Sequence, residues 1–537
     1  MAPARPSHPH REIAWWGWGD PDRARSLPEG LNGLLRDALG VRDGRPAPAS
    51  LEALQLTPVR LPAPAREALT AIVGPGHARA DQEARVRHLA GKSTIDLLRL
   101  RRAGVLTAPD LVVTPASHEE VLALLSECAA RRVAVVPFGG GTSVVGGLRA
   151  EAAKLAGTVA LDVGRLDALV DLDEESRLAV LEPGLRGPEA EALLGARGYT
   201  LGHFPQSWEY ATLGGFAAAR SSGQASAGYG RFDERVLALR LATPAGTLTT
   251  GRAPRSAAGP DLRQLVLGSE GTLGVITELT VAVDPAPAAR VYEGWRLPSF
   301  PTGAAVLRRL AQDGPPATVL RLSDEAETAL GLARPGALGA DPAGGGCLAI
   351  IGWEGRPEDV EARRAATAAV VRAAGGEPVP GAGEGWAEGR YSAPYLRDAL
   401  LDAGALVETL ETATFWSRVP GLYAAVSAAL RNSLTEQGSP PAILCHISHV
   451  YAAGASLYFT VACAQLPDPV AQWRRAKAAV GDAILGAGGS ITHHHGVGSD
   501  HREHYAREVG PLGMEALRAV KRSLDPEGIL NPGILLT

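Results

Sequence analysis

The stretch PFGGGTS, residues 137–143, follows the apolar run VAVV and ends it with three consecutive glycines. Glycine carries no Cβ, so successive backbone N–H groups can turn toward one ligand without a side chain in the way. Such a nest of amides is typical of phosphate-binding loops, with a plain glycine turn as the alternative. The stretch lacks the Gly-Lys-Ser/Thr ending of a Walker loop and the GxGxxG spacing of a Rossmann turn. It therefore predicts a buried strand that runs into a phosphate loop of neither common type.

The residues on both sides of this loop alternate between helix and strand patterns. LVVTP (111–115) is typical of a short buried strand, and apolar residues then recur at helical spacing over 121–128. Two further strands are expected on either side of the Pro-Ala-Gly turn at 244–246. The block 106–285 is therefore predicted to be an α+β unit with glycines at its strand ends.

Two more segments of this block are rich in glycine. GSEGTLG (268–274) predicts a tight turn into a strand. In QSWEYATLGGFAAARSSGQASAGYG (206–230), Thr212 is placed to cap a helix whose N-terminus could meet an anion. Gly214 and Gly215 would let that helix pack close to a neighbour.

The chain of 537 residues is too long for one hydrophobic core, so several units are expected. Residues 1–105 form an N-terminal helical and irregular segment, and 106–285 the unit just described. The proline-rich stretch 283–290 marks a boundary. Alternating strand and helix patterns over 286–485 predict an α/β cap domain whose sheet is covered on one face by helices. Residues 486–537 form a C-terminal segment with a helix from about 511 to 524.

Composition excludes several classes of protein. The apolar fraction of 45% rules out disorder as the main state, and a net charge of −5 argues against nucleic acid as a partner. No apolar stretch approaches the roughly 20 residues that span a bilayer, and the N-terminus lacks the apolar core of a secretory signal. The 4 cysteines form no CxxC pair. These features predict a cytoplasmic, reduced protein without a cysteine metal site.

The segment ITHHHGVGSDH (491–501) carries three adjacent histidines, His493, His494 and His495. They could act as acid–base groups, bind an anion or a metal, or form an inert polar turn. Adjacent side chains of an extended chain point to opposite sides, which disfavours chelation by this triplet alone.

Three other polar side chains lie in elements that are otherwise apolar. Tyr458 shares a predicted strand face with Ser456 and Thr460, so it should face a polar space, with a buried structural tyrosine as the alternative. Arg321 lies in the apolar strand TVLRLS, where a structural ion pair is the alternative. Arg397 lies in a predicted helix, where the alternative is a surface salt bridge.

The three glycine-rich segments, in this order and spacing, resemble the FAD-binding domain of the vanillyl-alcohol oxidase / p-cresol methylhydroxylase (PCMH) superfamily. The resemblance covers roughly 106–285 and implies a two-subdomain flavin unit. Some members attach the flavin to a histidine of the first loop, and this loop has none, so the resemblance implies non-covalent FAD. By match, the FAD contacts would be Pro137, Phe138, Gly139, Gly140, Gly141, Thr142, Ser143, Gln206, Ser207, Thr212, Ala219, Arg220, Ser221, Ser222, Gly268, Ser269, Glu270, Gly271, Thr272, Leu273 and Gly274.

Two branches of that superfamily compete. The hydroxy-acid dehydrogenases carry a divalent metal on an HxGDGNxH strand and a later EHGIG. Here the corresponding stretch 448–459 lacks the Asp and Asn, Tyr458 stands where the second histidine would be, and His494 replaces the glutamate. No metal is therefore expected. The chain instead resembles the alkyldihydroxyacetonephosphate synthase family over most of its length, through AWWGWG, PFGGGTS, GSEGTLGVIT, RLSD, YLRD, YAAGASLYF and GGSITHHHGVG.

This resemblance implies exchange of the acyl group of 1-acyl-dihydroxyacetone phosphate for a fatty alcohol in ether-lipid synthesis. No net redox occurs, and the flavin N5 would hold the dihydroxyacetone unit. Tyr458 and the triplet 493–495 would be catalytic, because removing a proton next to a ketone needs a positioned base. Arg397, by a bidentate phosphate contact, and Arg321 would bind substrate.

The resemblance also implies a homodimer and allows peripheral contact with a membrane. The alternatives are an FAD-dependent oxidase or dehydrogenase of a 2-hydroxy acid or alcohol, and a flavin- or lipid-binding protein without turnover.

Overall fold

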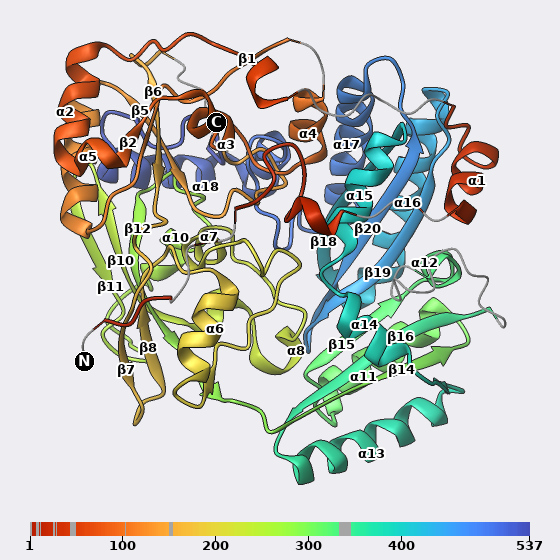
Figure 1. Ribbon diagram of the computed structural model, residues 1–537. Helices are drawn as coiled ribbons and strands as arrows, with labels where there is room; N and C mark the ends of the chain where they lie inside the picture. The colour runs from red at the N-terminus through yellow and green to blue at the C-terminus, as the bar shows by residue number, and fades with distance from the viewer. Residues whose placement is uncertain are drawn as a thin grey trace.

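The computed structural model describes residues 3–6, 10, 12–24, 27, 29–42, 50–101, 104–149, 154–331 and 345–536. The composition of the stretch 334–346, rich in Gly, Pro and Ala, predicts a mobile loop, and this stretch falls almost wholly outside the described residues. Among the described helices, none combines the length and the apolar character needed to cross a bilayer. Two smaller sheets form one half of the protein and a large sheet forms the other half (Figure 1).

A four-stranded sheet, in the order β2-β4-β6-β5, holds the glycine loop. Three of its strands are parallel and almost continuously buried, as is typical of parallel strands covered on both faces. The capping Ser117 begins the crossover helix, since its Oγ accepts the Glu120 N–H at 3.1 Å. The elements are β2 (Ala78–Arg79), β4 (Leu111–Val113), β5 (Ala134–Phe138), β6 (Thr158–Asp162), α2 (Ala63–Val73) and α5 (His118–Ala130).

The N-terminal segment takes part in both halves of the protein. β2 pairs with β4, and α2 shares a core with α5. α4 packs instead against α17, one of the helices that cover the large sheet. Short elements complete this segment: α1 (Glu29–Asp37), α3 (Gln82–Arg87), α4 (Thr94–Leu100), and β1 (Gln55–Leu56) paired with β3 (Val105–Leu106).

A five-stranded antiparallel sheet, in the order β11-β10-β12-β8-β7, completes the flavin-binding half. The predicted turn at Pro244-Ala245 is confirmed, because Thr243 pairs with Gly246 in a tight hairpin. Its strands are β7 (Leu169–Asp173), β8 (Leu178–Leu181), β10 (Val236–Thr243), β11 (Gly246–Thr250) and β12 (Val275–Ala282). The helices beside it are α6 (Gly187–Gly195), α7 (Leu213–Ala218), α8 (Ser226–Tyr229), α9 (Phe232–Arg235) and α10 (Arg263–Val266), with a short pair β9 (Tyr199–Thr200) and β13 (Asp284–Pro285).

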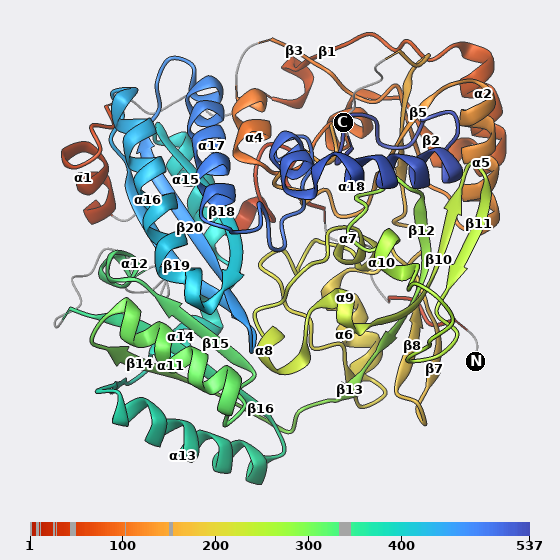
Figure 2. The ribbon, with the colours of Figure 1, turned by 180° about the vertical axis from the view of Figure 1, so that it is seen from behind.

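The other half is built on a seven-stranded antiparallel sheet, in the order β17-β14-β16-β15-β19-β20-β18. The sequence predicted helices on one face, and Figure 2 shows α11, α13, α16 and α17 in front of that face. The prediction was incomplete, because the shorter helices α14 and α15 pack on the opposite face (Figure 1). The strands are β14 (Ala289–Leu297), β15 (Val319–Ser323), β16 (Cys347–Gly355), β17 (Glu377–Val379), β18 (Ala405–Phe415), β19 (Ala442–Val450) and β20 (Gly454–Ala464). The helices are α11 (Phe300–Asp313), α12 (Glu325–Leu330), α13 (Pro357–Ala373), α14 (Ala382–Gly389), α15 (Ala393–Asp402), α16 (Val419–Glu436) and α17 (Pro469–Gly486).

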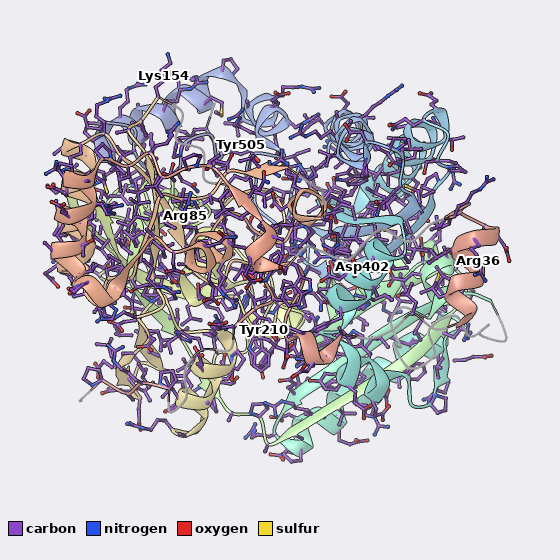
Figure 3. The ribbon with its side chains drawn as sticks, turned by 45° about the horizontal axis from the view of Figure 1, so that its top comes forward. Arg36, Arg85, Lys154, Tyr210, Asp402 and Tyr505 are labelled. Atoms are coloured by element: carbon purple, nitrogen blue, oxygen red, sulfur yellow. The ribbon has the colours of Figure 1, made fainter. Side chains whose placement is uncertain are left out.

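The opposite face of the large sheet looks toward the flavin-binding half. Leu457, Phe459 and Val461 are fully buried under the helices, so Tyr458 and Thr460 take the other face, as the alternation predicted. The two halves meet along an interface between this face and the flavin-binding half. Across it, the hydroxyl oxygen of Tyr210, labelled in Figure 3, lies 3.4 Å from that of Tyr395 of α15.

The C-terminal helix α18 (Arg502–Leu524) is longer than the predicted 511–524. Gly510, with φ of 78°, kinks it immediately before Pro511. Proline lacks an N–H and cannot continue a regular helix, so the predicted start at residue 511 coincides with the kink. The prediction missed the helical residues that precede the kink.

Candidate functional site

A cavity of about 890 Å³ lies between the two halves. The glycine loop forms one wall and the polar face of β15, β19, β20 and β18 forms the opposite wall. The predicted cofactor contacts that line it are Pro137, Phe138, Gly139, Gly140, Gly141, Thr142, Ser143, Gln206, Ser207, Thr212, Ala219, Ser221, Ser222, Ser269, Glu270, Gly271 and Gly274. Of the predicted substrate and catalytic residues, Arg321, Arg397, Tyr458, His494 and His495 line it.

Four predicted cofactor contacts lie behind this wall. Arg220 donates to the carbonyl of Leu267 at 2.9 Å and so braces the turn at Gly268. Thr272 donates to the Ser269 carbonyl at 2.7 Å, and Leu273 is buried in the core. These residues shape the loop rather than face the cavity.

The glycines of the first loop leave no room for side chains. A Cβ at Gly139 would collide with the hydroxyl of Thr212, and one at Gly140 with the carbonyl of Tyr210. Thr212 caps α7 as predicted, since its Oγ1 accepts the Gly215 N–H at 3.3 Å. The loop and the start of α7 therefore form one close-packed cradle of backbone groups.

The histidine segment is held from the cap sheet by a residue that the sequence analysis missed. Glu411 of β18 is 2% exposed, and its carboxylate accepts the Thr492 hydroxyl at 2.7 Å. It also accepts the backbone N–H groups of all three histidines of the triplet, at 2.5, 3.1 and 2.9 Å in chain order. Burial by itself would raise the pKa of Glu411, but the histidines and the hydroxyl together hold it well below its ordinary value.

A second buried carboxylate holds the other end of the same segment. Glu270, in the loop 268–274, accepts the N–H groups of Val497 at 2.7 Å and Gly498 at 2.8 Å. Its φ of 51° lies in the left-handed region, which turns the side chain toward that segment. Burial raises the pKa of Glu270 to about 7, against the effect of these two N–H donors. Residues 492–498 are thus suspended between one carboxylate from each half.

The three imidazoles take different positions. His493 points away from the cavity. Its Nε2 lies 3.0 Å from the guanidinium of Arg231 and 2.7 Å from the hydroxyl oxygen of Tyr451. His494 lines the cavity, and its Nδ1 lies 2.9 Å from His493 Nδ1. His495 lines it too, edge-on to Tyr458 at 5.6 Å between ring centroids. Burial lowers the pKa of His495 to about 3, so this ring is neutral at pH 7 and keeps a nitrogen lone pair.

Three histidines, His449, His493 and His494, are the candidate ligands for a metal ion. Their ring nitrogens lie within 4.8 Å of one another. His449 Nδ1 already contacts the hydroxyls of Ser222 and Ser226, and Arg231 places a positive charge against His493. A cation there would lie close to that positive charge, so the geometry favours a hydrogen-bonded cluster.

Tyr458 lies in a row of stacked rings on the cavity face. His446 of β19, directly opposite on the neighbouring strand, stacks on it at 4.8 Å with an interplanar angle of 20°. Burial raises the pKa of Tyr458 to about 12, so its hydroxyl is protonated at neutral pH. Glu327 orients His446, because its carboxylate oxygen lies 2.8 Å from the Nδ1 of that ring. The same carboxylate forms an ion pair with Arg321.

The two predicted substrate arginines are both engaged by carboxylates. Arg321 makes the ion pair with Glu327 that was its structural alternative, while its buried Nε has no partner. Arg397 contacts Asp398 at 2.9 Å and donates to the Lys92 carbonyl at 2.7 Å. Arg397 is not on the surface, because the N-terminal tryptophan segment covers it: Trp18 N–H also donates to Asp398.

The end of the cavity near α1 is aliphatic. Leu31 and Leu35 of α1, with Leu39 just after it, face Leu400 of α15 and Val407 of β18 in one buried cluster. Such a surface recognises a hydrocarbon chain and offers it few polar groups.

Acid should destabilise the fold through His203. Burial, with Arg235 and Arg231 nearby, lowers the pKa of this histidine to about 3 from the ordinary 6.5. Below pH 6.5 the unfolded chain therefore binds a proton at this histidine and the folded chain does not. The free energy of unfolding falls as the pH drops through that value. We expect a loss of ~2 kcal/mol between pH 8 and pH 5 from this residue.

Thermal unfolding at several pH values measures this effect. The His203→Gln variant should show a shallower loss of stability below pH 6.5 than the parent chain. Parallel pH profiles for the two proteins would contradict the assignment.

Comparisons with known proteins identify the family of the chain and the two halves of its fold. Residues 109–252 match the family model "FAD binding domain", and residues 286–535 match "FAD linked oxidases, C-terminal domain". The chain is 33% identical to alkyldihydroxyacetonephosphate synthase of Dictyostelium discoideum, over 98% of this chain and 94% of that one. A solved structure of alkyldihydroxyacetonephosphate synthase superposes with a TM-score of 0.81 at 30% identity, covering 97% and 98% of the two chains. The substrate-bound structure of p-cresol methylhydroxylase, at 16% identity and a TM-score of 0.67 over 89% and 98%, shares the fold.

Proposed function

Because the chain belongs to the alkyldihydroxyacetonephosphate synthase family of FAD-binding enzymes, we propose that it replaces the acyl group of 1-acyl-dihydroxyacetone phosphate by a fatty alcohol. The ester and the alcohol would yield an ether and a free fatty acid, with no net oxidation or reduction. The observation that carries this proposal is the aliphatic end of the cavity, formed by α1, α15 and β18. A small hydroxy acid has no part that would fill it.

The residues present fit FAD. The glycine cradle of 139–141 admits no Cβ, and the buried Nε2 of Gln206, which lines the cavity, has no partner within the described chain. The residues of loops 137–143, 206–212 and 269–274 that line the cavity would hold the cofactor. When bound, FAD supplies a ring that can take up and return a carbon group without a net change in oxidation state.

His495 and Tyr458 supply the proton chemistry in this proposal. The neutral imidazole of His495 accepts the proton that C1 of the substrate loses, with the nearby Glu411 carboxylate and the bound anionic substrate raising its pKa against the effect of burial. The protonated hydroxyl of Tyr458 donates to the neighbouring ketone oxygen, where negative charge develops. His494 supports both groups from the cavity wall, while His493 anchors the segment to Arg231 and Tyr451.

Substitution of Gly140 by valine should abolish flavin binding. The added side chain meets the backbone carbonyl of Tyr210, so the loop must move and its N–H groups lose their common direction. We expect purified protein with less than about a tenth of the parent's flavin, from the loss of two or more charge-assisted hydrogen bonds.

The flavin absorbance relative to protein measures the Gly140→Val effect. Gly76→Val is the control, since a Cβ at that glycine meets nothing within 4 Å. Full flavin content in Gly140→Val would show that this loop does not hold the cofactor.

An assay of the purified holoprotein tests the proposed reaction. Acyl-dihydroxyacetone phosphate and an isotopically labelled fatty alcohol are supplied together, and mass spectrometry follows labelled alkyl-dihydroxyacetone phosphate. Its formation supports the proposal. Reduction of a dye by a 2-hydroxy acid without ether formation would indicate an oxidoreductase, and lipid binding without any product would indicate a binding protein.

A further inference from the structure

Arg390 carries a positive charge into the cavity without a compensating carboxylate. It follows α14 directly and lines the cavity. Its guanidinium carbon lies over the rings of Phe204, Trp386 and Tyr391, at 5.3, 5.5 and 5.0 Å from their centroids. Three aromatic faces therefore hold the side chain in place.

The other cavity arginines differ in this respect. Arg23 pairs with Glu209 at 2.6 Å, Arg321 with Glu327, and Arg397 with Asp398 at 2.9 Å. Within the described chain, Arg390 has no carboxylate at ion-pair distance, and its buried Nη1 has no hydrogen-bond partner. Arg390 is thus the cavity arginine whose charge the protein itself leaves uncompensated.

Such an arrangement costs free energy unless a ligand completes it. A buried guanidinium N–H that has lost its water needs an acceptor, and the aromatic faces replace only part of its hydration. A ligand oxygen that carries negative charge supplies what is missing. An arginine prefers a planar pair of oxygens, as in carboxylate or phosphate.

A second unpartnered donor lies at the same end of the cavity. Val319 packs in one apolar cluster with Phe204 and Trp386, which underlie Arg390. Arg321 follows Val319 by two residues on the same face of β15, and its Nε is also buried without a partner. Arg321 therefore offers one free N–H on the same wall of the cavity, although Glu327 already balances its charge, and the uncompensated charge is that of Arg390.

We propose that Arg390, with the unpartnered Nε of Arg321 on the same wall of the cavity, binds the phosphate group of the substrate. This assignment rests on the proposed function for the identity of the substrate, and it adds a residue that the sequence analysis did not consider. Arg397 then contacts the substrate with its charge already balanced by Asp398. The phosphate ends near α14, and the hydrocarbon chain runs toward α1.

The test compares phosphorylated and phosphate-free ligands in the holoprotein. Dihydroxyacetone phosphate and dihydroxyacetone are titrated without turnover by calorimetry, and the KM is measured for 1-acyl-dihydroxyacetone phosphate. We expect Arg390→Met to weaken binding of both phosphate esters by about 10- to 100-fold, the range for loss of a charged hydrogen bond. Arg390→Lys should lie between, because it keeps the charge and loses the planar pair of donors.

Arg372→Met is the matched control. Arg372 makes the same kind of contact, over the Trp295 ring at 5.3 Å, on α13 outside the cavity. It should leave phosphate binding unchanged. Unchanged affinity in Arg390→Met, or an equal loss for dihydroxyacetone and its phosphate, would overturn the inference.

Flavin content distinguishes the two sources of phosphate. If Arg390→Met and Arg390→Lys lose FAD, the group serves the cofactor's pyrophosphate, and the inference fails. Because the titrations need no turnover, they also separate the two proposals. Phosphate binding through Arg390 without ether formation would refute the proposed reaction alone, whereas ether formation with an unchanged KM in Arg390→Met would refute this inference alone.

Discussion

Replacing Tyr458 by phenylalanine is expected to lower kcat by about 100- to 10,000-fold, the usual contribution of a positioned acid or base. The change removes one hydroxyl from the cavity face of β20 and leaves the ring that stacks on His446 at 4.8 Å. Folding and flavin content should therefore stay close to those of the parent. The phenol is protonated at neutral pH, because burial raises its pKa to about 12, so the lost function is that of a hydrogen-bond donor.

Steady-state kinetics and the flavin spectrum together measure this effect. Tyr199→Phe removes a hydroxyl from β9, outside the cavity, and serves as the control. A Tyr458→Phe enzyme with a kcat within threefold of the parent would remove Tyr458 from the proposed chemistry. Loss of flavin in that variant would assign the tyrosine to cofactor binding.

The second large effect is expected from Glu411→Gln. The carboxylate accepts one hydroxyl and three backbone N–H groups of residues 492–495. A glutamine offers one acceptor oxygen and directs an NH₂ group at donors, so at least one buried N–H loses its partner. The histidine segment must then move away from the position that sets His495 against Tyr458.

We expect kcat to fall at least 100-fold, because small displacements of catalytic groups are costly. The free energy of unfolding should fall by about 1–3 kcal/mol, the penalty for an unsatisfied buried group. Glu408→Gln is the matched control, since Glu408 lies on the same strand, is 3% exposed, and accepts backbone N–H groups of Thr94 and Thr409. It should reduce stability and spare turnover.

Equal losses of turnover in Glu411→Gln and Glu408→Gln would mean that the strand, rather than the histidine segment, is what Glu411 supports. A Glu411→Gln enzyme that keeps its kcat would contradict the positioning role altogether.

Local patterns in the sequence predicted the elements that depend on local chemistry. The glycine loop, the cap at Thr212, the hairpin at 244–246 and the two faces of the strand around Tyr458 follow from backbone freedom, capping and alternation. Each is decided by residues a few positions apart, so the sequence contains the whole argument.

The charges that organise the cavity could not be predicted in this way. Glu411 lies 82 positions before the His493 N–H that it accepts, and Glu270 lies 227 before that of Val497. One signal was available for the first of these, because Glu408 and Glu411 lie three positions apart in the strand-like stretch VETLETATF and so face opposite sides of a sheet, where a buried charge requires a partner. The sequence places Trp386 and Tyr391 close to Arg390, but the third ring, Phe204, comes from the other half of the protein, so only the fold shows that three rings surround this charge.

The most direct test of the central claim, exchange without net oxidation, follows flavin and product in one anaerobic mixture. The holoprotein receives acyl-dihydroxyacetone phosphate and a fatty alcohol labelled with oxygen-18. The account predicts an ether that carries the label, one fatty acid released for each ether formed, and an oxidised flavin spectrum that is unchanged at the end of the reaction. Flavin that is bleached by the mixture or by a 2-hydroxy acid, with no labelled ether, would contradict it.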